Sequence, residues 1–271
     1  MCNNFENEKK LLALRKYLKS KKKVAVAFSG GVDSAFLLKF SALVLKKNAI
    51  AINARSILQT KGESAEIKDF CNFHKIALHT IQFEPLTIPN FSKNPKNRCY
   101  FCKKAIFNQI KQTAKTLGFT AIIEGSNADD MGDFRPGMKA LEELGIESPL
   151  KMLGITKAEI RQWAKMLKIE QWNKASSACL ASRINYGEKI TQKKLYIIEE
   201  SEQFLHDLGV LQCRVRMHQN IARIEVLSEQ MPIILENKEK IDKMLKSLGF
   251  DFVTLDLFGF KSGSLNKVFK M

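Results

Sequence analysis

The run SGGVDS at residues 29–34 has the residue types of a phosphate-binding loop. It lies between a short, mostly apolar segment (23–28) and a longer apolar run, which predicts a turn from a buried strand into a helix. There, backbone N–H groups and the helix dipole point at an anion, and glycine lets a phosphate approach the main chain. The Walker A lysine and the GxGxxG spacing are both missing. The run predicts another kind of nucleotide loop, with Asp33 to orient Mg²⁺; the alternative is a tight turn whose serines only cap the helix.

A second segment, at 124–137, offers small and acidic residues directly after another predicted strand (119–125). Open α/β sheets bind ligands at the carboxyl ends of their strands. Gly125 would allow a nucleotide to approach closely, and carboxylates for Mg²⁺ would come from Asp129, Asp130 and Asp133. Taken alone, the segment would be an acidic surface loop.

Three of the six cysteines lie where thiol chemistry is favoured. Cys99 and Cys102 form a CxxC at the start of a predicted helix, and Cys179 lies in a loop where the nearby Arg183 favours the thiolate. Zinc normally takes four ligands and no second CxxC exists, whereas three cysteines suit a [4Fe–4S] cluster with one open iron. A redox pair, or two packed thiols, are the alternatives. Small buried side chains are expected for Cys2, Cys71 and Cys213.

The elements that must position these residues fall into two predicted domains. Buried strands alternate with helices over 1–175, which predicts an α/β domain with an open parallel sheet and helices on both faces. Residues 176–271 predict a smaller α+β domain: a helix at 191–208, a hairpin of 213–218 and 221–226, a helix around 228–248 and a strand at 251–258. A capping box at Thr156 and Glu159 predicts a helix over 157–168.

Arginines of the predicted hairpin are candidates for binding a phosphate. Arg214 and Arg216 are two apart on one strand and therefore share a face, and Arg223 of the partner strand could join them. The alternative is a solvated face of a half-buried strand.

The formal net charge of +16 rests mainly on lysine, because only nine of the 44 basic residues are arginines. Scattered lysines indicate a solvated surface, so no specific nucleic-acid partner is expected. No apolar run is long enough to cross a bilayer, and the first residues lack the core of a signal peptide. These features predict a cytoplasmic enzyme that does not bind membranes, and we expect a homo-oligomer acting on a small molecule.

The loop SGGVDS resembles the PP-loop of the ATP pyrophosphatases, which cut ATP between the α- and β-phosphates and join AMP to the substrate. From about residue 5 to residue 268 the chain is similar to one family in this superfamily, the LarE-type ATP-dependent sulfur transferases. These enzymes mature the nickel-pincer nucleotide cofactor of lactate racemase. The motifs that carry the resemblance are SGGVDS, NRCYFCK (97–103), GSNADDMGDFRPG (125–137), ACLASRINYG (178–187), RVRMHQNIARIEV (214–226) and LDLFGFKSGSLN (255–266).

The resemblance implies a substrate, a pyridinium mononucleotide whose two ring carboxylates become thiocarboxylates. It assigns sulfur transfer to Cys179, which either gives up its own sulfur and becomes dehydroalanine or joins Cys99 and Cys102 in holding a [4Fe–4S] cluster. Mg²⁺ would be held by Asp33 and Asp129. Substrate phosphate or carboxylate would be bound by Arg183, Arg214 and Arg216. ATP would be bound by Ser29, Gly30, Gly31, Asp33, Ser34 and Gly125.

Three other functions share parts of this pattern. A tRNA 2-thiolation enzyme would share the loop, the three cysteines and the charge, but the chain has no zinc-ribbon pairs and no arginine-rich tract for RNA. An amide-forming ligase such as a NAD synthetase would leave the cysteines unexplained. A nucleotide-sensing module would bind ATP without releasing pyrophosphate.

Overall fold

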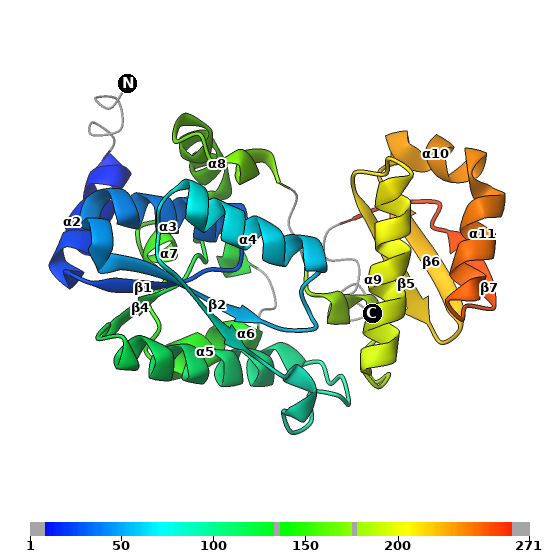
Figure 1. The fold of residues 1–271 in the computed structure, drawn as a ribbon, viewed down its shortest axis with the longest axis horizontal. Coiled ribbons are helices and arrows are strands. Elements are labelled where there is room, and N and C mark those ends of the chain that lie inside the picture. Colours follow the sequence, from blue (N-terminus) through cyan, green and yellow to red (C-terminus); the bar gives the residue numbers. More distant parts are fainter. Residues whose placement is uncertain (1–8, 133–135, 175–177, 262–271) are drawn as a thin grey trace. The chain divides into compact units, whose positions relative to one another are not determined.

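The computed structural model describes residues 9–132, 136–174 and 178–261, which belong to two compact units (Figure 1). The first unit comprises Met1–Glu84 and Asn97–Ser177, and the second comprises Pro85–Lys96 and Ala178–Met271. Each unit has its own sheet and its own helices.

The first unit contains a four-stranded parallel sheet with the order β3-β2-β1-β4. Its strands are β1 (Val24–Ala27), β2 (Ala49–Arg55), β3 (Leu78–Gln82) and β4 (Ala121–Ile123). The chain runs outward from β1 to β2 and β3 on one side, and then returns to β4 on the other side of β1. Such a reversal opens a crevice at the carboxyl ends of the strands.

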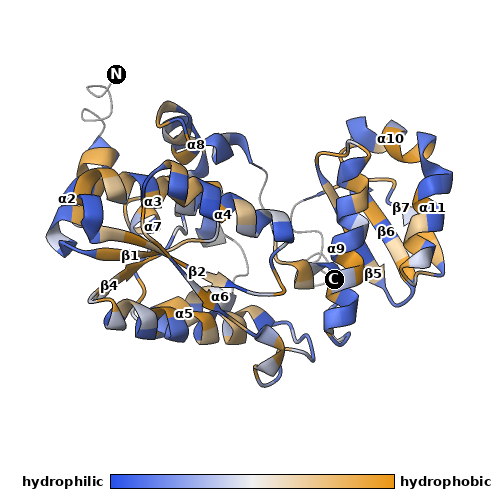
Figure 2. Cartoon of the chain, viewed as in Figure 1, coloured by the Kyte–Doolittle hydropathy of each residue, from blue (hydrophilic) through white to orange (hydrophobic). Residues whose placement is uncertain are grey.

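Helices cover both faces of this sheet, which confirms the predicted α/β class. One face packs against α2 (Lys9–Lys21), α3 (Val32–Leu45), α4 (Lys61–Phe73) and α8 (Lys157–Met166). The other packs against α5 (Arg98–Thr116) and α6 (Pro136–Glu143), and the short α7 (Pro149–Met152) follows. The two clusters alternate along β1, because Val24 and Val26 face the first and Ala25 faces the second. Figure 2 shows the resulting apolar sheet between helices that carry hydrophilic residues.

The second unit has a three-stranded sheet with the order β5-β6-β7. An antiparallel hairpin joins β5 (Cys213–His218) to β6 (Ile221–Val226) through Gln219, which has a φ of 54°. The third strand, β7 (Phe252–Leu255), lies parallel to β6, and α9 (Gln192–Asp207) covers the hairpin. The predicted small α+β architecture is present.

Two element predictions in this unit are wrong in extent. The single helix expected around 228–248 is two helices, α10 (Met231–Glu236) and α11 (Lys238–Ser247). The break falls at Asn237, whose side-chain amide donates to the carbonyl of Ile233 at 2.9 Å and so competes with the helical ladder. The last strand ends early because Asp256 accepts a hydrogen bond from the N–H of Phe258 at 2.9 Å, which is an Asx turn.

The segment Pro85–Lys96 packs in the second unit, which sequence analysis did not anticipate. Its anchor is Asn94, a fully buried residue with a φ of 56°. The Asn94 amide donates to the carbonyls of Ile184 (3.2 Å) and Asn185 (2.7 Å), and its own carbonyl accepts from the N–H of Gly187 at 2.9 Å. These bonds fix the chain that follows Cys179.

Candidate active site

Glycines give the loop between β1 and α3 its shape. Gly30 has a φ of 81°, and a Cβ there would lie 2.9 Å from Cγ1 of Ile67. Gly31 is the N-cap of α3, and its carbonyl accepts from the Ser34 hydroxyl at 3.0 Å. A second hydroxyl, that of Ser29, lies 3.2 Å from Ser34 Oγ. The serines therefore stabilise the loop. The first N–H groups of α3 have no side-chain cap and are available to bind an anion.

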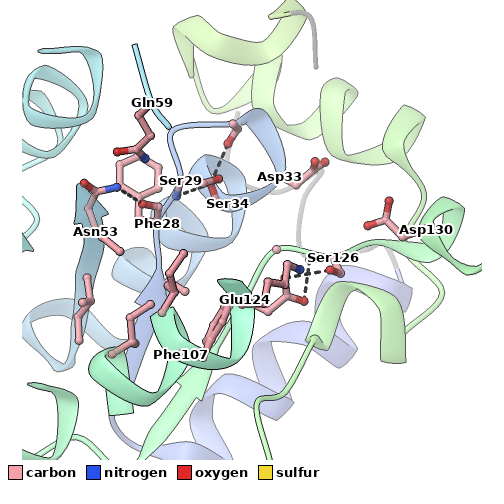
Figure 3. Close-up of a pocket in the computed structure, with 18 residues that line it drawn as sticks. Phe28, Ser29, Asp33, Ser34, Asn53, Gln59, Phe107, Glu124, Ser126 and Asp130 are labelled. Atoms are coloured by element: carbon pink, nitrogen blue, oxygen red, sulfur yellow. Dashed lines mark hydrogen bonds between the residues drawn. The ribbon is translucent and has the colours of Figure 1, made fainter. Parts of the chain in front are cut away.

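A cavity of about 320 Å³ lies beside this loop, at the carboxyl ends of β1, β2 and β4 (Figure 3). Apolar side chains, including Ile52, Phe107 and Ile110, form much of its wall. The polar residues around it are Ser29, Asp33, Ser34, Asn53, Gln59, Lys103, Glu124, Ser126 and Asp130. A mixed wall with a phosphate loop at one end suits a nucleotide, whose base is apolar and whose phosphates are charged.

Gly125 brings the segment after β4 against the first turn of α3. A Cβ there would lie 2.8 Å from the backbone N of Ser34, so no larger residue fits without moving the loop. The neighbouring Glu124 is buried and accepts from Ser126 N–H at 3.0 Å and Ser126 Oγ at 2.9 Å, and also from the hydroxyl of Ser148. These bonds hold Gly125 in contact with the loop.

The carboxylate of Asp33 lies on the cavity wall and is paired with a lysine from a distant segment. Lys157 Nζ is 2.5 Å from Asp33 Oδ2. Burial raises the pKa of Asp33 above its ordinary value, although the ammonium of Lys157 lowers it, and nearby Asp130 raises it further. Asn127 also favours the charge, but the buried Oδ1 accepts no hydrogen bond of ordinary geometry from the described residues. Asp33 is therefore an ionisable group with unused acceptor capacity.

The two aspartates that follow β4 have different environments. Asp129 Oδ2 accepts from the backbone N–H of Lys157 at 2.8 Å, at the start of α8. Asp130 lines the cavity, and its Oδ2 accepts from the N–H of Asn127 at 3.0 Å. Asp133, the third predicted carboxylate, lies outside the described residues. The pair Asp33 and Asp130 fits a hard cation such as Mg²⁺, because two carboxylates face one cavity and one buried oxygen lacks a donor.

The CxxC lies in the first turns of α5, as predicted. Cys99 is exposed and Cys102 is half-buried, whereas the helix buries Phe107, Ile110 and Ala114 behind them. Both thiols therefore lie at the accessible end of a helix whose other end is packed into the core.

Cys179 is exposed, and the turn that it begins is held rigidly. A short 3₁₀ turn (Leu180–Arg183) follows it, and Arg183 is only 2% exposed. Arg183 donates from Nε and Nη2 to Glu202 of α9 at 2.9 and 2.7 Å, and from Nη1 to the Cys179 carbonyl at 3.1 Å. Burial opposes the charge of Arg183, but Glu202 outweighs burial and raises its pKa. Arg183 therefore contacts the backbone of Cys179 in this arrangement.

Arg214 and Arg216 share one face of β5, and both are buried, so this face is not a solvated one. Arg216 donates from Nε and Nη2 to Glu225 at 3.1 and 3.0 Å, and from Nη1 to the Ser182 carbonyl at 2.7 Å. The Arg214 guanidinium lies 5.4 Å from the ring centre of Phe260. Burial lowers the pKa of Arg214, and nearby Arg183 adds to this effect.

The predicted cluster ligands come from both units. Cys99 and Cys102 belong to the first, and Cys179 belongs to the second. Within the described part of the chain, no three side chains of His, Cys, Asp or Glu converge as a ready metal site. A cluster with these three ligands would therefore take thiols from each unit.

Two other cysteines behave as predicted, because Cys71 and Cys213 are buried. Burial raises the pKa of Cys71 to about 12, and it raises the pKa of Cys213 as well. Neither thiol is poised to ionise at neutral pH. Cys2 lies outside the described residues.

Comparison with known proteins identifies the family. The chain is 34% identical over 250 residues, 92% of its length and 91% of the relative's, to the pyridinium-3,5-bisthiocarboxylic acid mononucleotide synthase of Lactiplantibacillus plantarum. The chain belongs to the LarE-type family. It is also 39% identical to an uncharacterized protein of Synechocystis (96% of this chain, 98% of that one) and 32% identical to one of Methanocaldococcus jannaschii (94% and 98%). No protein-family model matches the chain.

The structure shows residues at these sites that sequence analysis missed. Lys157 and Asn53 contact the loop region, and Glu202 and Glu225 hold the arginines beside Cys179. Only Lys157 had a local signal, since it directly follows the predicted cap Thr156. Among the described residues no helix combines the length and apolar character that a bilayer span requires.

Proposed function

We propose that the chain is an ATP-dependent sulfur transferase that converts a ring carboxylate of a pyridinium mononucleotide into a thiocarboxylate. The observation that carries this proposal is the 34% identity, over 92% of the chain, to a relative named for making the bisthiocarboxylic acid. The cavity beside a glycine-rich loop supports it, because ATP bound there could activate the carboxylate as an adenylate.

In the first step a substrate carboxylate oxygen attacks the α-phosphorus of ATP. The bond between that phosphorus and the bridging oxygen of the β-phosphate breaks, and pyrophosphate leaves with the electron pair. The N–H groups at the start of α3, together with Ser29 and Ser34, would stabilise the charge of the leaving group. Asp33 and Asp130 would hold the Mg²⁺ that accompanies ATP, while Asp129 stays on the N–H of Lys157.

In the second step a sulfur nucleophile displaces AMP from the acyl-adenylate. In one route Cys179 itself attacks and forms a thioester; loss of its α-proton then breaks the Cβ–S bond, leaving a thiocarboxylate and dehydroalanine. In the other route Cys99, Cys102 and Cys179 would hold a [4Fe–4S] cluster, which would supply the sulfide that displaces AMP. The exposed Cys179 suits either route, and the exposed Cys99 with the half-buried Cys102 suits the second.

The substrate phosphate or carboxylate would be bound by Arg214 and Arg216, together with Arg183. Because Arg183 and Arg216 already pair with Glu202 and Glu225, a bound anion would share them with those carboxylates. A cytoplasmic location and a homo-oligomeric state remain predictions.

Anaerobic protein, ATP and the biscarboxylate mononucleotide provide the test. We expect AMP and pyrophosphate in equal amounts and a product in which sulfur has replaced oxygen. Iron and acid-labile sulfide analysis, with the mass of the Cys179 peptide after reaction, separates the two sulfur routes, because only the sacrificial route removes H₂S from that peptide. ADP and orthophosphate as products, or selective thiolation of a tRNA, would contradict the proposal.

A further inference from the structure

The charges around the loop are unfavourable for a triphosphate. Three carboxylates line the cavity, those of Asp33, Glu124 and Asp130, whereas Lys103 is the one basic residue lining it among the described residues. ATP would add further negative charge, and the glycine-rich loop lacks a lysine of its own. Lys103 and the Mg²⁺ that accompanies ATP would offset part of this charge, and a second ammonium near the loop would offset more of it.

Lys157 is placed to supply that cation. Its Nζ contacts the cavity-lining Asp33, and its side chain is 29% exposed. Its backbone is fixed, because the N–H of Lys157 donates to Asp129 and the preceding Thr156 forms a capping box with Glu159. A rigid base with a flexible four-carbon side chain allows the ammonium to move while the helix stays in place.

The ion pair with Asp33 holds the Lys157 ammonium only weakly. The two side chains are 29% and 22% exposed, so solvent screens part of the attraction between them. Asp33 Oδ1 accepts no hydrogen bond from the described residues. Both partners would gain from an incoming ligand that carries phosphate oxygens and a cation.

We propose that Lys157 is a binding residue for the β- and γ-phosphates of ATP, held on Asp33 until the nucleotide enters. When MgATP binds, the ammonium moves to a phosphate oxygen, and the freed Asp33 carboxylate meets the magnesium. Lys157 thus does from the start of α8 what the lysine of a Walker A loop does from within that loop. This inference rests on the proposed function, since it assigns a residue to the same nucleotide site.

Calorimetric titration can test this role without any pyridinium substrate or sulfur source. The ligands are α,β-methylene-ATP with Mg²⁺, pyrophosphate with Mg²⁺, and AMP. For Lys157→Gln we expect affinity for the first two to fall about 10- to 100-fold, the cost of one lost charged hydrogen bond, while AMP binds within about twofold of wild type. Lys157→Arg should keep part of the affinity because it keeps the charge.

Lys10→Gln is the matched control. Lys10 also forms an ion pair, with Glu159 at 2.8 Å, but Glu159 does not line the cavity, whereas Asp33, the partner of Lys157, does. All three affinities should be unchanged in this variant. The inference is overturned if Lys157→Gln binds α,β-methylene-ATP as tightly as wild type, or if AMP binding falls equally. A protein that shows the Lys157 effect but transfers no sulfur would contradict the proposed function and leave this inference standing.

Discussion

The cavity beside the glycine-rich loop of the first unit and the arginine face of the second unit (Arg183, Arg214 and Arg216) differ in how completely their charged groups are paired within the protein. In the cavity, Asp33 is paired through one oxygen only, and Gly31 and Gly125 are part of the lining. On the arginine face, Arg183 and Arg216 each make two bonds to one glutamate and also donate to at least one backbone carbonyl.

The comparison shows that the type of a charged residue does not say whether it is available to a ligand. An arginine with a bidentate glutamate partner first of all holds its own fold together, and a ligand must share it. An aspartate in a cavity with a carboxylate oxygen that accepts no hydrogen bond can still accept one from a ligand or bind a cation. Substitutions in the cavity and on the arginine face test this difference. The loss of a buried glutamate partner should have the largest effect on stability.

Glu202→Ala would leave Arg183 buried without its carboxylate. Removing one partner of a buried ion pair costs about 3–5 kcal/mol of unfolding free energy, so the variant should unfold at clearly lower denaturant concentration. Lys246→Ala is the control, because its pair with Asp242 is about half exposed and contributes little. Equal midpoints for Glu202→Ala and wild type would show that the arginine face does not depend on its own pairing.

Asp33→Asn should slow substrate-dependent pyrophosphate release about 10²- to 10³-fold, the range for removing one preorganised electrostatic group. The fold should be retained, because the amide has the shape of the carboxylate. Pyrophosphate release and the far-ultraviolet circular dichroism spectrum should be measured on the same protein. Release at the wild-type rate would mean that the cavity does not use this carboxylate.

Arg214→Ala and Arg216→Ala should each weaken binding of the substrate mononucleotide by about 1.5–3 kcal/mol, with ATP affinity nearly unchanged. The two differ in one respect, since loss of Arg216 also removes two hydrogen bonds from the buried Glu225. We therefore expect the Arg216 variant to be the less stable of the two in a thermal melt. An equal loss of affinity for both ligands would indicate a folding defect instead of a lost contact.

The smallest effect concerns the pH dependence of stability. Since the folded state raises the pKa of Asp33, its carboxyl favours folding below the unfolded pKa and opposes it once pH exceeds the folded pKa. Asp33→Asn should therefore be at least as stable as wild type at neutral pH, and the difference should disappear in acid. Urea denaturation at several pH values measures it. A variant that is less stable at neutral pH, and recovers in acid, would reverse the sign.

Much of the first unit followed from sequence because its signals are local. Apolar strands, the glycine loop and the capping box of Thr156 and Glu159 are each set by residues within a few positions of one another. The pairings that define the sites are not local. Lys157 is 124 positions from Asp33, and Glu202 is 19 positions from Arg183. No periodicity or spacing links such residues, because only the folded chain brings them together.

The glutamate partners also change the prediction made for the arginines. The arginines were predicted as ligand-binding groups from their type and their common face. Neither property indicates that glutamates from other parts of the fold pair with them. The break at Asn237 was missed for a related reason, since the apolar pattern continues across it and only a side-chain bond interrupts the helix.

The placement of Pro85–Lys96 has a consequence for how the molecule can be taken apart. The chain passes between its units at residues 84–85, 96–97 and 177–178, so no single cut separates them. A fragment that starts at Ala178 would lose Asn94 and leave the carbonyls of Ile184 and Asn185 without their donor.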